Sequence, residues 1–255
     1  MPFVNAGGHK LEYERFDVGG PERPTLVLLH EGLGSVAMWR DFPQRLAHAT
    51  ATRVVVYSRY GYGNSDPLRG ARDVRYMHDE ALVALPEFID ALRIGRPILV
   101  GHSDGASIAL IHAGTDVRPI RGVIAIAPHV LIEDISIESI AAARDAYTTT
   151  RMRKRLSRYH ADVDGAFRGW NDIWLHPDFR AWNIEESLPT IRCPVLAIQG
   201  EDDEYGTMEQ LARIAAAVDD VRLLKLADCR HSPHRDQAIT LTNAIVRFVD
   251  RLAQQ

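Results

Sequence analysis

The chain has 255 residues, of which 46% are apolar and 25% charged, and these proportions are those of an ordinary globular protein. The formal net charge of −4 offers no basic surface to nucleic acid, and no apolar run is long enough to cross a membrane. The N-terminus has no basic segment followed by an apolar one, so we expect no signal peptide. The two cysteines, Cys193 and Cys229, are expected to be free thiols in a cytoplasmic protein.

Strand-like and helix-like segments alternate along most of the chain. Residues 11–16 alternate apolar and polar side chains, as an edge strand does. Short apolar runs predict buried strands at residues 25–29, 53–57, 98–100, 123–126, 195–198 and 221–226. Three- and four-residue spacing predicts helices at residues 74–92, 104–113, 208–218 and 239–252, with Pro86 expected to bend or break the first. This order indicates an α/β fold, in which a mostly parallel, twisted sheet has helices on both faces.

The alternation lapses over residues 131–190, which have a helical pattern throughout. A structureless loop of that length is improbable in a compact domain. We therefore predict a helical cap at 131–190, lying over a core domain of 1–130 and 191–255. The basic run at 151–155 is expected to be a solvated helix face. The segment also holds Trp170, Trp174 and Trp182, which either hold the cap together or line a pocket beneath it.

The most informative stretch is Gly101-His102-Ser103-Asp104-Gly105, which follows an apolar strand and runs directly into a small-residue helix. A sharp strand-to-helix turn of this kind presents a serine hydroxyl above the carboxyl end of the sheet, and the glycines remove side chains that would collide in the turn. The backbone N–H of Asp104, in the first turn of the helix, has no partner within the helix and suits a developing oxyanion. Ser103 is the predicted nucleophile.

A serine nucleophile needs a base, usually an imidazole oriented by a carboxylate. In folds with such a turn the chain order is serine, acid, histidine. Among 11 histidines, His231 follows the last predicted strand, and His234 is interpreted as a surface-loop residue. The preceding strand ends in a turn with four acids, in which either Asp202 or Asp203 has the right place for the orienting carboxylate.

An early strand leads into His30-Glu31-Gly32-Leu33-Gly34-Ser35. The loop after this strand is expected to supply a second backbone N–H to the oxyanion, because glycines allow close approach to a ligand. Such a donor contributes about 3 kcal/mol of transition-state stabilisation.

Together with Ser58-Arg59-Tyr60-Gly61-Tyr62-Gly63-Asn64-Ser65, these motifs make the chain resemble the α/β-hydrolase superfamily over nearly its whole length. The resemblance implies the α/β-hydrolase fold with a helical cap inserted after the sixth strand. It selects Asp203 as the acid of a triad with Ser103 and His231, and it assigns the oxyanion donors to the N–H groups of Gly32 and Asp104. No cofactor is implied, and no His/Cys cluster has the spacing of a metal site.

The chain departs from the superfamily pattern at Glu31, where glycine is common, and at Arg230, which precedes the histidine where glycine is common. If the Glu31 carboxylate points into the pocket, it should disfavour anionic substrates. Glu31, His129, Trp170 and Trp174 are the candidate pocket residues.

We therefore expect a serine hydrolase that cleaves a carboxylic ester, thioester or lactone of a small to medium, partly apolar substrate through an acyl-enzyme on Ser103. The alternatives are a ligand receptor and a C–C bond hydrolase or lyase, because one fold hosts many reactions. The expected partner is a small-molecule substrate rather than nucleic acid or a membrane, and a homo-oligomer is left open.

Overall fold

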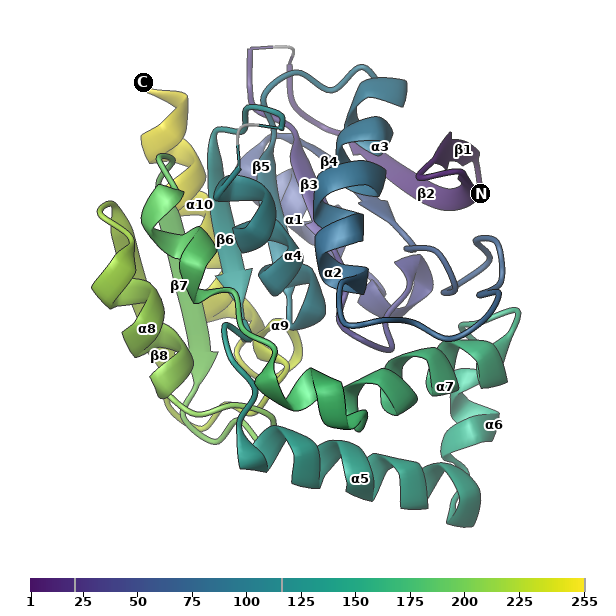
Figure 1. Cartoon of the computed structure of the whole chain (residues 1–255). Coiled ribbons are helices and arrows are strands. Elements are labelled where there is room, and N and C mark those ends of the chain that lie inside the picture. Colours follow the sequence, from purple (N-terminus) through teal and green to yellow (C-terminus); the bar gives the residue numbers. More distant parts are fainter. Residues whose placement is uncertain (21, 116, 255) are drawn as a thin grey trace.

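The computed structural model describes residues 1–20, 22–115 and 117–254. Within these residues, an eight-stranded sheet in the order β1-β2-β4-β3-β5-β6-β7-β8 forms the centre (Figure 1). The strands are β1 (Phe3–Ala6), β2 (His9–Asp17), β3 (Leu26–Leu29), β4 (Arg53–Tyr57), β5 (Ile98–His102), β6 (Gly122–Ile126), β7 (Val195–Gly200) and β8 (Val221–Leu226). From β4 through β8 neighbouring strands pair in parallel, which confirms the predicted fold class.

The N-terminal edge of the sheet differs from the prediction. Residues 11–16 lie in β2, which pairs antiparallel with β4 on one side and with β1 on the other, so the edge strand is β1. Gly7 and Gly8 join β1 to β2, and both have positive φ, as a two-residue hairpin turn requires. At four residues, β1 is too short for its alternation to stand out in the sequence.

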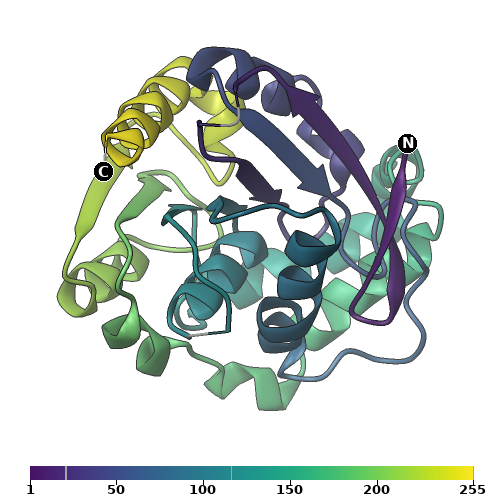
Figure 2. The same cartoon turned by 90° about the horizontal axis from the view of Figure 1, so that it is seen from above.

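Helices cover both faces of the sheet (Figure 2). The helices α1 (Phe42–Thr50) and α10 (Ala238–Ala253) share one apolar cluster with side chains of the central strands. On the other face lie α3 (Leu85–Ala91), α4 (Asp104–Ala113) and α8 (Glu209–Ala217). The central parallel strands are buried along most of their length because both faces are covered, which explains their near-continuous apolar sequences.

The segment predicted as one helix at 74–92 is divided. It comprises α2 (Tyr76–Asp79), a π-helical turn η2 (Glu80–Ala84) and α3. Pro86 lies in the first turn of α3, where its missing N–H costs least. A wider, π-helical turn thus lies just before the proline, in the segment where the sequence predicted a bend or break.

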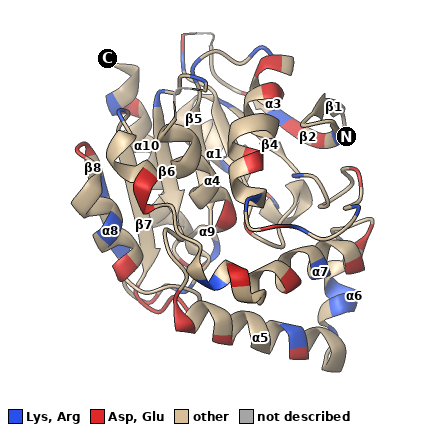
Figure 3. Ribbon diagram, in the orientation of Figure 1, with Lys and Arg blue, Asp and Glu red and all other residues tan. Residues whose placement is uncertain are grey.

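Between β6 and β7 the chain forms a helical insertion at the carboxyl ends of the strands (Figure 1). Its helices are α5 (Asp134–Thr149), α6 (Met152–Leu156), α7 (Val163–Trp174) and the 3₁₀ turns η3 (Pro177–Ala181) and η4 (Glu185–Thr190). Its buried side chains join the apolar cluster on one face of the sheet. Basic residues gather on α6 (Figure 3), where they are exposed as expected. That the insertion is a separate cap bounded by residues 131 and 190 stays a prediction.

The two cysteines are free, as expected. None of the helices that the structure describes combines the length and apolar character needed to cross a bilayer.

Candidate active site

The turn between β5 and α4 carries the predicted nucleophile. Ser103 has φ 54° and ψ −120°, a backbone conformation that non-glycine residues rarely adopt. A β-carbon on Gly101 would collide with the backbone of Gly105, and one on Gly105 would collide with the carbonyl oxygen of Leu29. The two glycines therefore let the strand, the serine and the helix pack tightly, which holds residue 103 at the carboxyl end of the sheet.

Replacing Gly101 by alanine should destabilise the fold. The added methyl group meets backbone atoms that cannot move without shifting α4, so we expect a loss of about 3 kcal/mol in the free energy of unfolding, measured by urea titration. Gly95→Ala is the matched control, because a β-carbon there meets nothing within 4 Å. A Gly101→Ala protein as stable as the control would contradict this account of the turn.

The structure brings His231 and Asp203 together from different loops. The Nδ1 atom of His231 lies 2.8 Å and 2.9 Å from the two carboxylate oxygens of Asp203. Asp202, which the sequence pattern alone left as an alternative, is exposed. A carboxylate so placed fixes the tautomer with the proton on Nδ1 and leaves Nε2 free to accept one.

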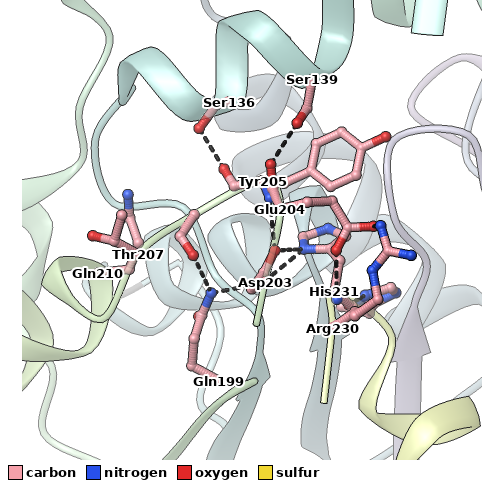
Figure 4. A network of polar contacts seen from close by, with 12 residues as sticks. Ser136, Ser139, Gln199, Asp203, Glu204, Tyr205, Thr207, Gln210, Arg230 and His231 are labelled. Carbon is pink, nitrogen blue, oxygen red and sulfur yellow. Dashed lines mark hydrogen bonds and ion pairs between the residues drawn. The ribbon is translucent and has the colours of Figure 1, made fainter. Parts of the chain in front are cut away.

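Further polar contacts hold Asp203 in place (Figure 4). The backbone N–H of Tyr205 donates to one carboxylate oxygen at 2.8 Å, and the side-chain amide of Gln199 donates to the other at 2.6 Å. Burial alone would raise the pKa of Asp203, but its hydrogen bonds to His231 and Tyr205 bring that pKa below its usual value. The carboxylate therefore stays ionised beside the imidazole.

Ser103 and His231 line the same cavity, which has a volume of about 260 Å³. No hydrogen bond joins their side chains within the described part of the chain, and in ligand-free structures such contacts are often loose. A different contact ties the two segments together, since the Nε2–H of His102 donates to the main-chain oxygen of His231 at 2.7 Å. The nucleophile turn and the histidine loop are thus held side by side through the residue preceding Ser103.

The two predicted oxyanion donors come from adjoining segments. Gly32 lines the cavity, and a β-carbon on it would collide with the indole of Trp170, so no larger residue fits there. The side chain of Asp104 is fully buried and is directed at Arg59 and Tyr76 rather than into the cavity. Its backbone N–H lies in the first turn of α4, directly after Ser103.

The model of the alpha/beta hydrolase family matches residues 26–244, which is most of the chain and includes every element of this site. The chain belongs to this family. It is therefore a hydrolase built on the α/β-hydrolase fold, as the resemblance implied.

Individual relatives within the family cleave different bonds. The chain is 22% identical, over 98% of its length and 91% of the relative's, to 2-hydroxy-6-oxo-6-(2'-aminophenyl)hexa-2,4-dienoic acid hydrolase of Metapseudomonas resinovorans. It is 25% identical, over 93% and 96%, to a putative carbamate hydrolase of Variovorax paradoxus strain S110. It also superimposes on the enol-lactonase of Burkholderia xenovorans LB400 with a TM-score of 0.76, at 22% identity over 98% and 100% of the two chains. Similarity to these proteins therefore does not identify the bond that this chain hydrolyses.

In this α/β hydrolase the four predicted pocket residues Glu31, His129, Trp170 and Trp174 all line the cavity. Trp182 does not line it, and its ring stacks on Phe179. Glu31 faces both the cavity and His102, whose Nδ1 lies 3.5 Å from the carboxylate. Burial would raise the pKa of Glu31, but the contact with His102 and the neighbouring histidines hold that pKa well below its usual value. A negative charge therefore lies next to Gly32, the predicted oxyanion donor.

Sequence reasoning missed most of the apolar wall. The insertion contributes Ile140, Met152 and Leu156, and Met38 and Leu33 complete the wall. The four-residue spacing of Met152 and Leu156 on one helix was the available signal. Tyr205 and Arg235 line the cavity as well, and no sequence pattern pointed to either of them as a pocket residue. Among the residues described, no three His, Cys, Asp or Glu side chains are arranged to hold a metal ion.

The prediction for His234 was wrong. This residue lies in the short helix α9 (Pro233–Asp236), where it is buried, with its ring 5.1 Å from that of Trp39 and 5.0 Å from that of His102. Burial first, and then the neighbouring His102, lower its pKa to about 3, against the opposing effect of Glu31. The pKa of His129 is likewise lowered to about 3, by burial and by His231, against the opposing effect of Asp203.

These two histidines should make folding pH-dependent. Because their pKa is about 3 in the folded state and about 6.5 in the unfolded chain, the unfolded state binds more protons between those values. Stability is then fully present above pH about 6.5 and falls as the pH drops, by about 1.4 kcal/mol per unit for each histidine. Urea titrations at several pH values between 4 and 7 give the free energy of unfolding as a function of pH. This free energy should fall less steeply with decreasing pH in His234→Gln than in the wild type. His48→Gln, on the exposed face of α1, is the control, and an unchanged slope in His234→Gln would contradict the assignment.

Proposed function

We propose that this α/β hydrolase is a serine hydrolase that cleaves a carboxylic ester, or a related thioester or lactone, through an acyl-enzyme on Ser103. In the proposed mechanism His231 takes the Ser103 proton as Oγ attacks the carbonyl carbon, and the N–H groups of Gly32 and Asp104 stabilise the oxyanion. His231 then protonates the leaving group, and it later activates water to release the acid.

The observation that carries the proposal is the imidazole of His231, held at 2.8 Å by a buried carboxylate, in one cavity with a serine in a strained turn. A carboxylate, an imidazole and a serine in this order are what acyl transfer requires. No step in this scheme calls for a metal or an organic cofactor. The buried aromatic and aliphatic wall favours an acyl group that is partly apolar.

The charge of the cavity favours uncharged substrates. Glu31 and Glu204 line it, and the cation at its wall, Arg235, is largely exposed. Because Glu31 lies in the loop proposed to hold the substrate carbonyl, an anionic group on the acyl chain would meet a like charge there. We therefore propose a neutral ester as substrate and give less weight to acids of the kind named for the Metapseudomonas relative.

The test combines labelling with a substrate panel. A fluorophosphonate should phosphonylate Ser103, with loss of fluoride, and mass spectrometry of the digested protein should locate the label. p-Nitrophenyl butyrate should be hydrolysed faster than p-nitrophenyl hemisuccinate, a charged ester of similar length, and Glu31→Gln should narrow that difference. Tight ligand binding with no turnover would instead favour a receptor, and activity confined to a diketone or a cyanohydrin would favour a C–C bond hydrolase or lyase.

A further inference from the structure

A buried arginine lies directly behind the nucleophile turn. Arg59 follows β4, and only 1% of its surface is exposed. Its Nη2 atom donates to the main-chain oxygen of Glu31 at 2.9 Å and lies 3.7 Å from the carboxylate of Asp104. The same atom is 3.3 Å from the main-chain oxygen of His30. One guanidinium nitrogen therefore contacts both the loop after β3 and the start of α4.

These two segments are the ones that supply the proposed oxyanion donors. The carbonyl oxygen of Glu31 belongs to the same peptide unit as the N–H of Gly32, so the donors on that oxygen set the plane in which the N–H points. The Nδ1–H of His30 at 2.6 Å and the backbone N–H of Gly34 at 3.0 Å also donate to this oxygen, and Arg59 is the donor among the three that also reaches Asp104. It also polarises the peptide and strengthens its N–H as a donor. The Asp104 carboxylate, held by the same guanidinium, belongs to the residue whose backbone N–H is the second donor.

We infer that Arg59 is the positioning residue of the oxyanion hole, aligning the Gly32 and Asp104 N–H groups through the Glu31 carbonyl and the Asp104 carboxylate. The inference rests on the proposed function. Stability alone accounts poorly for such a residue, because a buried ion pair is often no better than apolar side chains of the same volume.

The support extends to the wall of the cavity. The hydroxyl of Tyr76 donates to Asp104 at 2.8 Å and accepts a hydrogen bond from the indole N–H of Trp174 at 3.0 Å. Trp174 lies in α7 of the insertion and lines the cavity. Arg59 and Tyr76 thus both contact the same carboxylate oxygen of Asp104, and Tyr76 links it to the insertion.

The test uses Arg59→Lys, which keeps the charge but replaces the planar guanidinium with a single ammonium group that cannot reproduce its contacts. Two inhibitors separate the effects. A trifluoromethyl ketone with the acyl chain of a good substrate takes the Ser103 oxygen at its carbonyl carbon, so the carbonyl electron pair moves to an oxyanion and the serine proton moves to His231. The corresponding trifluoromethyl carbinol cannot form this adduct and reports ground-state binding alone.

We expect Arg59→Lys to lower kcat and the affinity for the ketone by the same factor, about 10- to 100-fold, since losing a donor outright costs about 10²- to 10³-fold. KM and the affinity for the carbinol should stay within about twofold, because ground-state contacts are unchanged. Arg23→Lys is the matched control. Arg23 is partly buried and likewise pairs with an acid, Asp250, at 2.8 Å, but it precedes β3 at the opposite end of the sheet.

Each possible result either supports or overturns the inference. Unchanged ketone affinity in Arg59→Lys, or equal losses for ketone and carbinol, would overturn the positioning role. If Arg59→Lys fails to fold, Tyr76→Phe is judged by the same two inhibitors and should show a smaller parallel loss in kcat and ketone affinity, and no loss would overturn the inference. A wild-type protein that neither hydrolyses esters nor binds the ketone would instead refute the proposed function itself.

Discussion

Ser103→Ala is expected to lower kcat/KM for a p-nitrophenyl ester by about 10⁴- to 10⁶-fold. Without Oγ no acyl-enzyme forms, and the remaining rate is that of water attacking a carbonyl bound in the oxyanion hole. The measurement is steady-state hydrolysis, in which the release of p-nitrophenol is followed by absorbance at about 400 nm. The same protein preparation is used for thermal unfolding.

The variant should fold and bind as the wild type does. Ser103 is 6% exposed and the substitution removes only a hydroxyl, so the melting temperature of the variant should change little. Alanine keeps the β-carbon, so the backbone strain at φ 54° is unchanged. Ser157→Ala, on the exposed end of α6, controls for the substitution itself. Ester hydrolysis at more than about a tenth of the wild-type rate in Ser103→Ala would mean that another group is the nucleophile.

Asp203→Asn is expected to lower kcat by about 10³- to 10⁴-fold. An amide at this position can donate to Nδ1 of His231, and the imidazole would then carry its proton on Nε2. In that tautomer Nε2 cannot accept the proton of Ser103, although every heavy atom stays close to its place. Burial of the carboxylate makes the effect large, because water cannot take its place beside the imidazole.

The neighbouring acid provides the matched control. Asp202 is exposed, so Asp202→Asn should keep kcat within about twofold of wild type. Comparable losses in the two variants would show that the turn as a whole, rather than one carboxylate, supports His231.

Much of the architecture could be predicted because its causes are local. Each central strand is an apolar run bounded by turn residues. The turn between β5 and α4 needs glycine at both 101 and 105, because a β-carbon at either position would collide with backbone atoms. The hairpin of β1 and β2 was not predicted because β1 has only four residues. The π-helical turn before Pro86 was not predicted because it depends on how the helix packs.

The site was predicted unevenly for the same reason. Ser103 lies in a local motif, and chain order suggested His231, whereas the choice of Asp203 over Asp202 in the structure depends on which carboxylate is buried against the imidazole. His234 was misread because its loop is polar in sequence, yet the short helix α9 turns its ring inward onto Trp39.

The class of fold, the place of the strained turn and the residue at its apex could all be read from the sequence, since they follow from hydrophobic periodicity and from the steric freedom of glycine. Only the packed structure shows that Glu31 faces the cavity and that Arg59 lies behind both the loop at Glu31 and the start of α4 at Asp104, which are 73 residues apart in the chain. Burial and the direction of a side chain depend on what other segments pack against it, and no local pattern encodes that.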